Sequence, residues 1–134
     1  MKSVMLDTNI LVSAILKRNS VPYKAYMKAI EVPYRGLVCD NILEELRSVF
    51  IRKFPDSIAL LDSFVAEIIQ KVEIVPTPLP IHIDEAKIPD VKDRPILRAA
   101  ISAKADIIVT GDNDFLLSGI TNPRIMKASD FCDI

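Results

Sequence analysis

The stretch VMLDTNIL, residues 4–11, sets an aspartate between two apolar runs and decides the fold. Burying a lone carboxylate costs several kcal/mol or forces the group to take up a proton. The first run predicts a short strand that ends at Asp7, and Thr8 can then begin a helix. Apolar side chains recur in residues 8–17 at the spacing of a buried helical face. These side chains are Ile10, Leu11, Ala14 and Ile15.

The bulk composition is that of an ordinary globular protein. A chain of 134 residues, half of them apolar and 26% charged, suits one domain spanning residues 1–134. No apolar run approaches the roughly 18 residues that a membrane span needs, and the N-terminus lacks the features of a signal peptide. We therefore expect a cytoplasmic protein with no membrane partner. Cys39 and Cys132 lack C-x-x-C spacing, so we expect two reduced thiols.

The net charge of -1 argues against a strongly basic nucleic-acid-binding domain. The charge is nevertheless uneven, because residues 1–54 hold nine Lys/Arg against five Asp/Glu, whereas residues 55–134 hold eight against thirteen. A basic segment within residues 17–35 could face phosphates, although charge alone favours a solvated helix face. Its cations are Lys17, Arg18, Lys24, Lys28 and Arg35.

Strand and helix patterns alternate along the whole chain. Alternation of this kind predicts βαβ units, a parallel sheet and helices on both of its faces, which is an α/β fold. Further strands are expected at 36–39, 72–75, 106–110 and within 122–131. Further helices are expected at 22–32, 41–54, 57–71 and 94–105, with Asp40 as the N-cap of the second of these. Residues 76–92 are expected to be mostly irregular, with IHI at 81–83 briefly extended.

Acidic side chains follow two of the predicted strands. Asp7 ends the first strand, and Asp112 and Asp114 come directly after IIVT in the segment TGDND. Because functional groups in parallel sheets gather beyond the C-terminal ends of the strands, these acids should share one edge. Asp106 precedes its strand, so we expect it at the opposite edge in a structural role.

The predicted helix at 41–54 supplies two candidate glutamates. At about 100° per residue, Glu44 lies roughly 160° from the centre of the apolar face and Glu45 roughly 100° from it. A side chain on the border of the packed face can reach a cleft, so we favour Glu45. Asp90 and Asp93 precede another helix, where acids also complement the helix dipole without any further role.

Clustered carboxylates raise one another's pKa unless a cation compensates them. Mg²⁺ or Mn²⁺ suits such a site, because hard ions take oxygen ligands. His82 is the chain's only histidine, so a histidine-rich zinc centre is excluded, and we expect His82 in a strand or loop. A divalent cation held by carboxylates indicates phosphodiester chemistry.

Four segments that span nearly the whole chain belong together: LDTNIL, ILEELRSVF, DVKDRPILRAAISAKADIIVTGDNDFL and IMKASDF. In this order they resemble the PIN-domain family. The resemblance is strongest to its short prokaryotic members similar to VapC-type ribonucleases, which are the toxin components of toxin–antitoxin pairs. The resemblance implies a Rossmann-like three-layer α/β/α sandwich and a Mg²⁺- or Mn²⁺-dependent endoribonuclease.

The resemblance also implies roles for individual residues. The family's four catalytic, metal-binding acids fall on Asp7, Glu45, Asp93 and Asp112, and Asp114 matches an additional metal-binding acid. Supporting positions fall on Asn9, Asp90 and Thr110. The expected partners are an RNA substrate, a cognate antitoxin and a second copy of the chain.

Two other functions stay open at this point. A non-catalytic PIN module could bind RNA or protein, although the complete set of acids argues against it. A phosphatase similar to the haloacid dehalogenases would need a second aspartate two residues after Asp7, where Asn9 stands.

Overall fold

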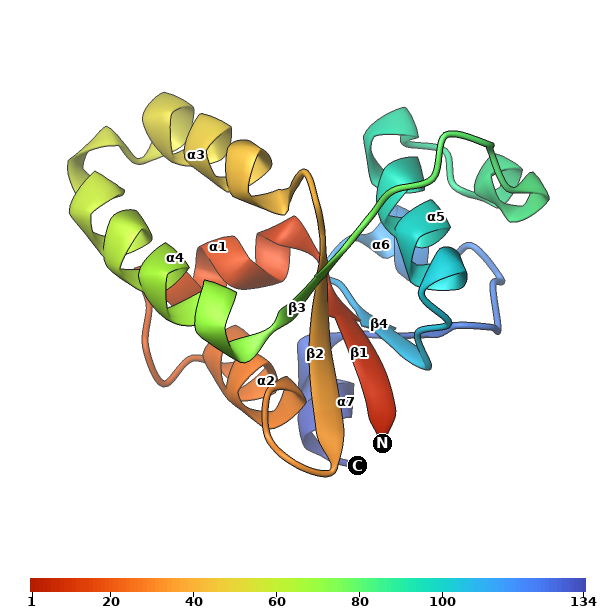
Figure 1. The fold of residues 1–134 in the computed structure, drawn as a ribbon, viewed down its shortest axis with the longest axis horizontal. Coiled ribbons are helices and arrows are strands. Elements are labelled where there is room, and N and C mark those ends of the chain that lie inside the picture. Colours follow the sequence, from red (N-terminus) through yellow and green to blue (C-terminus); the bar gives the residue numbers. More distant parts are fainter.

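The computed structural model describes residues 1–134 and shows a five-stranded parallel sheet between two layers of helices (Figure 1). The strands are β1 (Lys2–Leu6), β2 (Tyr34–Cys39), β3 (Glu73–Val75), β4 (Ile107–Val109) and β5 (Arg124–Met126). They lie in the order β3-β2-β1-β4-β5, and every neighbouring pair is parallel. The alternating pattern of the sequence thus leads to the expected three-layer α/β/α sandwich.

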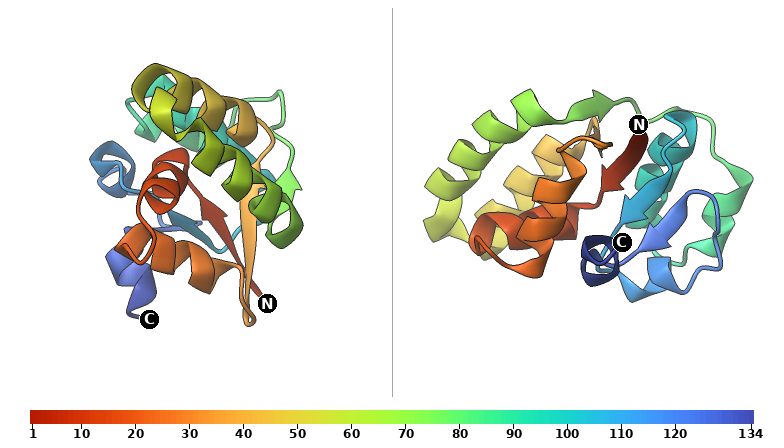
Figure 2. Two further views of the ribbon diagram at one scale, coloured as in Figure 1. Left: turned by 90° about the vertical axis from the view of Figure 1, so that its left-hand side faces the viewer. Right: turned by 90° about the horizontal axis from the view of Figure 1, so that it is seen from below.

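The helices divide between the two faces of the sheet (Figure 2). One layer contains α1 (Thr8–Leu16), α2 (Val21–Ala29), α3 (Ile42–Lys53), α4 (Ile58–Lys71) and the C-terminal α7 (Ala128–Cys132), which packs on α2. The other contains α5 (Arg94–Ser102) and the short α6 (Asn113–Leu116). No helix has the length and hydrophobicity needed to cross a membrane.

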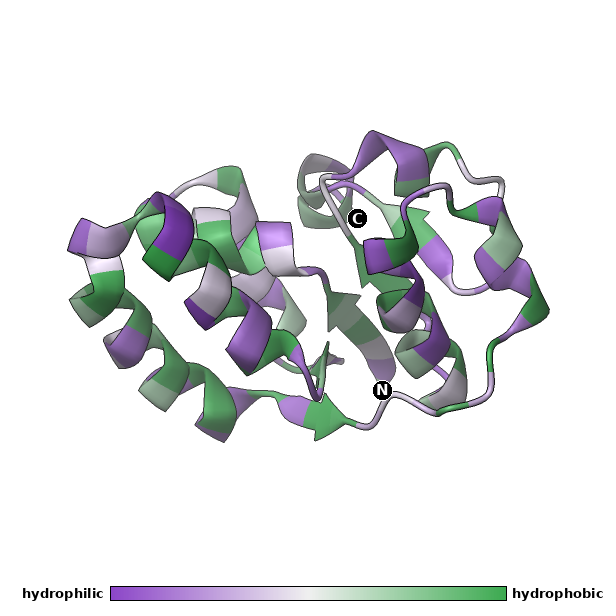
Figure 3. Ribbon diagram, turned by 90° about the horizontal axis from the view of Figure 1, so that it is seen from above, coloured by the Kyte–Doolittle hydropathy of each residue, from purple (hydrophilic) through white to green (hydrophobic).

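The central strands are buried on both sides, as parallel strands covered by helices must be. Val4, Met5 and Leu6 of β1 are at most 1% exposed. The helices carry alternating hydrophilic and hydrophobic bands, which is the pattern of elements that bury one face (Figure 3). A single cluster of 34 buried apolar residues joins the sheet to both helical layers.

Local signals in the sequence account for most helix starts. The Asp7 carboxylate caps α1 by accepting a hydrogen bond from the Thr8 N–H. The Ser20 hydroxyl caps α2 in the same way by accepting from the Tyr23 N–H. Pro95 lies in the first turn of α5, where a missing N–H costs nothing.

The predicted N-cap at Asp40 is wrong. Helix α3 begins after Asn41, whose side chain makes no capping hydrogen bond to it. The Asp40 carboxylate instead accepts hydrogen bonds from the hydroxyl and the N–H of Thr77, at 2.8 and 3.2 Å. A partner 37 residues away has therefore taken the oxygens that would have capped the helix.

Within the segment 81–83, His82 has the extended backbone that was predicted, whereas Ile83 begins a 3-10 turn, Ile83–Lys87, that His82 caps. Its Nδ1 accepts from the Asp84 N–H, and Glu85 accepts from the His82 N–H in return. Helix α2 also ends three residues earlier than expected, at Ala29. Pro33 disfavours a helical conformation at Val32, so the helix does not reach its predicted end at residue 32.

The order of the strands creates a switch point between β1 and β4. The chain runs outward from β1 through β2 to β3, and it then returns through α5 to β4 on the other side of β1. Crevices beyond the C-terminal ends of the strands at such a point are where α/β proteins bind ligands. Asp7 and Asp112 both follow strands that end there.

Candidate functional site

Asp7 is held rigidly at the junction of β1, α1 and β4. Its N–H donates to the Val109 carbonyl at 3.0 Å, which continues the pairing of β1 with β4 beyond the strand end. One carboxylate oxygen accepts from the Thr8 N–H at 2.7 Å, and the other accepts from the Thr110 hydroxyl at 2.6 Å. Both oxygens are thus fixed in direction before any ligand binds.

Burial is the main influence on the charge of Asp7, which is only 3% exposed. Desolvation raises the pKa of Asp7 from 3.8 to about 6, although the hydrogen bonds from Thr110 and Thr8 oppose the rise. The neighbouring charges of Glu45 and Asp112 raise the pKa further. The fold therefore keeps a carboxylate where its ionised form is poorly compensated.

Asp90, Asp93 and Asp112 form a second acidic group beside Asp7. One carboxylate oxygen from each lies within 4.8 Å of the others. Asp90 accepts from the Lys92 N–H at 3.0 Å and Asp112 from the Asp114 N–H at 2.9 Å, so both are anchored by the turns that they cap. The resemblance placed Asp90 among the supporting residues, and in the structure its carboxylate lies close to those of Asp93 and Asp112.

Asp93 and Asp112 shift each other's pKa in opposite directions. Desolvation, the hydrogen bond with Asp112 and the charges of Asp7, Asp112 and Asp90 all raise the pKa of Asp93. The same hydrogen bond lowers the pKa of Asp112, since its charged form accepts the proton that Asp93 donates. Two carboxylates this close cannot both ionise at neutral pH without a cation.

Glu45 reaches this site from α3. It is half-buried and lines a cavity of about 290 Å³ together with Asp7 and Asp93, and its neighbour Glu44 is exposed. This agrees with the prediction, from helical angles, that Glu45 lies on the border of the packed face. Four separate segments of the chain therefore contribute acids to one edge of the sheet.

The remaining predicted residues differ in their distance from the acids. Asn9 accepts a hydrogen bond from the Gly111 N–H at 3.2 Å and so ties α1 to the loop after β4. Thr110 is fully buried and also accepts from the Asp112 N–H at 3.1 Å, linking Asp7 to Asp112. Asp114 contributes its N–H to Asp112, but its own carboxylate is exposed and outside the group of close acids.

These acids fit a hard divalent cation. No lysine, arginine or histidine forms an ion pair with Asp7, Asp90, Asp93 or Asp112. The Oδ2 atom of Asp93 is buried and has no hydrogen-bond partner. An orphaned buried oxygen among uncompensated carboxylates is the donor set that Mg²⁺ or Mn²⁺ accepts. His82 caps a turn elsewhere and adds no nitrogen ligand.

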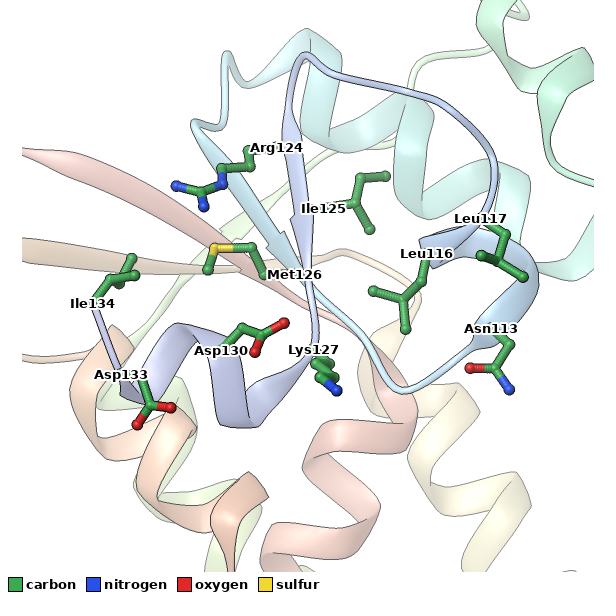
Figure 4. A pocket seen from close by; sticks show the side chains of 10 residues that line it. All are labelled: Asn113, Leu116, Leu117, Arg124, Ile125, Met126, Lys127, Asp130, Asp133 and Ile134. Atoms are coloured by element: carbon green, nitrogen blue, oxygen red, sulfur yellow. The ribbon is translucent and has the colours of Figure 1, made fainter.

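A larger surface cavity, of about 620 Å³, lies elsewhere (Figure 4). Asn113, Leu116 and Leu117 of the α6 region line one side of it, and Asp130 and Asp133 at α7 line the other, with β5 between them. None of the predicted site residues lines this cavity, so the cavity is not the candidate active site despite its size.

Lys53 also lines the cavity of Asp7 and Glu45, and it was not among the residues predicted from the sequence. Helical angles did not single it out, because at about 100° per residue Lys53 lies roughly 80° around the helix from Glu45, and Arg52 lies closer. Part of the basic segment 17–35 has a packing role instead. Lys28 donates to the carbonyls of Phe131 and Cys132, at 2.8 and 3.3 Å, and thereby fastens α7.

Comparisons with known proteins agree with this fold. The family model described as PIN domain matches residues 3–114. Among solved structures, a chain of the crystal structure of VapBC2 from Rickettsia felis, bound to a DNA fragment from their promoter, superposes with a TM-score of 0.68. The two chains are 21% identical, and the match covers 93% of this chain and 98% of that chain. The search of curated proteins found no match.

Proposed function

Because this chain belongs to the PIN-domain family, we propose that it is a metal-dependent endoribonuclease and the toxin of a type II toxin–antitoxin pair. One observation carries the enzymatic part of this proposal. Acids from four segments converge at the switch point, and no basic side chain pairs with Asp7, Asp93 or Asp112. Residues 1–134 would act as one domain.

We assign the metal-binding role to Asp7, Glu45, Asp93 and Asp112, with Asp114 as an additional ligand. Bound Mg²⁺ or Mn²⁺ supplies Lewis-acid polarisation of the phosphate and lowers the pKa of water. Asn9, Asp90 and Thr110 support these side chains. The hydroxyl of Thr110 holds the Asp7 carboxylate in one orientation, and Asp90 keeps negative charge close to Asp93.

Hydrolysis requires a proton to move while bonds at phosphorus change. The oxygen of the attacking water bonds to phosphorus and loses a proton, and the leaving oxygen gains one as its bond to phosphorus breaks. Asp93 and Asp112 would both be ionised as ligands of the cation, because metal ligands must be deprotonated. These protons would therefore pass to and from water.

The proposed partners follow from the toxin assignment. The similar Rickettsia felis structure is described as VapBC2 with promoter DNA. By analogy, we propose that this chain forms a homodimer and is inhibited by a cognate DNA-binding antitoxin in the cytoplasm. Induced expression with and without Asp7→Asn, followed by sequencing of new RNA 5′ ends, tests the toxin part. Growth arrest by the variant would contradict it.

Cleavage in vitro tests the enzymatic part. We expect a labelled single-stranded RNA to be cut with Mg²⁺ or Mn²⁺ and to stay intact with EDTA. Glu45→Gln should lower the rate at least roughly 100-fold, since even outer partners of metal ligands cost 10- to 100-fold. Glu44→Gln is the matched control on the next residue, and it should keep wild-type activity. Equal rates for the two variants would refute the assignment of Glu45.

A non-catalytic role would give a different result. RNA would then bind with the same affinity in Mn²⁺, in EDTA and after Asp93→Asn, and no conditions would produce cleavage. The absence of cleavage with both metals by a folded protein would overturn the nuclease proposal.

A further inference from the structure

The cavity beside the acids is a channel between two helices. Helix α3 lines it with Glu45, Val49 and Lys53, which stand at i, i+4 and i+8 and therefore share one face. Helix α1, which packs against α3, lines it with Thr8 and Val12 at the same spacing. The volume of about 290 Å³ is near the lower end of the range of ligand pockets.

Lys53 is a cation at the far end of this channel with no acidic partner. Eight residues of helix separate it from Glu45 by about 12 Å, at 1.5 Å per residue. It forms no ion pair, although three acids line the same cavity. A lysine in the last turn also complements the dipole of α3, but Arg52 shares that role and does not line the channel.

The wall between the acids and Lys53 is apolar. Val12, Val49 and Phe54 supply the apolar surface. The channel therefore offers an apolar wall beside the acids and a positive charge beyond it.

We propose that this channel holds the nucleotide next to the cleaved phosphate of a single-stranded RNA, with Lys53 binding the adjoining phosphate. The proposal rests on the nuclease function above and adds a substrate-binding residue to it. The sugar and base lie along Val12, Val49 and Phe54. A channel between two packed helices accepts one strand, and single strands present unstacked bases to such surfaces.

Lys53→Gln and Arg52→Gln form a matched pair for the test. Both remove one positive charge from the same exposed helical turn, so their effects on stability through the helix dipole should be equal. Steady-state cleavage of a fluorescein-labelled single-stranded RNA in Mn²⁺ measures KM and kcat. We expect Lys53→Gln to raise KM about 3- to 10-fold with a smaller change in kcat, Lys53→Arg to keep most of the affinity, and Arg52→Gln to match the wild type.

Binding measured without cleavage separates this proposal from the nuclease function. In an Asp93→Asn background with EDTA, fluorescence anisotropy over a series of salt concentrations gives the slope of log K against log [salt]. Loss of one phosphate contact should reduce that slope by about 0.7 for a single strand. The slope should fall with Lys53→Gln and not with Arg52→Gln.

The outcomes distinguish the two proposals. If the wild-type chain cleaves no RNA but its salt dependence of binding changes with Lys53→Gln, the nuclease proposal is refuted and the phosphate contact of Lys53 is supported. An active wild-type enzyme for which Lys53→Gln and Arg52→Gln give equal KM values and equal slopes would overturn the role of Lys53. Equal thermal unfolding temperatures for both variants would show that folding does not account for a difference.

Discussion

Replacing Asp7 by Asn should make the metal-free protein more stable at neutral pH. The Asp7 side chain is 3% exposed, and its pKa is raised to about 6 because burial penalises the ionised form. An amide keeps the shape of the side chain and removes the charge. The oxygen of Asn can still accept the Thr8 N–H, so the cap of α1 survives the change.

The size of the effect follows from the pKa. A rise from 3.8 to about 6 corresponds to about 3 kcal/mol of lost folding free energy once Asp7 is ionised, at 1.36 kcal/mol per pH unit. Asn recovers only part of this free energy, because its amide nitrogen cannot accept the hydrogen bond that the Thr110 hydroxyl donates to Asp7. We therefore expect a gain of about 1–2 kcal/mol at pH 7, or roughly 3–8 °C in unfolding temperature.

The pH dependence has a definite sign. An acid whose folded pKa is raised is least harmful when protonated, so its contribution is most favourable below about pH 4. Stability is lost as the pH rises through about 4 to 6 and levels off above that. The difference between Asp7→Asn and the wild type should therefore be small near pH 4 and full at pH 7. Urea denaturation in EDTA at each pH measures it.

Divalent metal should reverse the ranking. A ligand that binds only the folded state adds about 2.7 kcal/mol at 100 times its dissociation constant. Mn²⁺ should therefore stabilise the wild type and have little effect on Asp7→Asn. A variant that is less stable than the wild type at pH 7 in EDTA, or whose stability difference does not change with pH, would refute the account of Asp7 as an uncompensated buried carboxylate.

Three further substitutions test other parts of the fold. Thr110→Val should destabilise the protein by about 1–3 kcal/mol in urea denaturation, because Asp7 loses a buried hydrogen-bond donor; no loss would show that this bond is dispensable. Arg98→Met should destabilise the protein in urea denaturation, because it leaves the Glu85 carboxylate, 2% exposed, without its 2.8 Å ion pair. Adding Glu85→Gln to Arg98→Met should recover part of that loss. A double variant that loses the sum of the two single-variant losses would contradict an interaction between Arg98 and Glu85. Arg47→Ala should cost under about 1 kcal/mol, since its ion pair is exposed, and a larger loss would be unexpected.

Where the physics is local, the sequence was a sufficient guide. The apolar run before Asp7 and the helical spacing after it lie at β1 and α1 in the structure. Helix angles distinguished the half-buried Glu45 from the exposed Glu44. The opposite-edge prediction for Asp106 was also confirmed, since its carboxylate accepts from the Ser3 N–H at 2.8 Å at the start of β1. Each of these depends on a few neighbouring residues or on the direction of one strand.

Where distant partners compete, the sequence was misleading or silent. Asp40 has the chemistry of an N-cap, yet Thr77 takes its oxygens. His82 caps a turn together with Glu85, which Arg98 holds in place from α5. Local propensity cannot include a competitor that arrives only after the chain has folded.

The composition and periodicity of the chain by themselves determined an α/β sandwich with acids at the ends of its strands, because strand direction fixes which edge a following residue reaches. Only the tertiary structure decided which acids meet. The strand order sets the switch point between β1 and β4, and that brings Asp7 beside Asp112 through Thr110. It also brought Asp90 against Asp93 and gave Lys53 a place in the channel of α1 and α3. Pairings of this kind depend on the packing of whole elements, which no single stretch of sequence encodes.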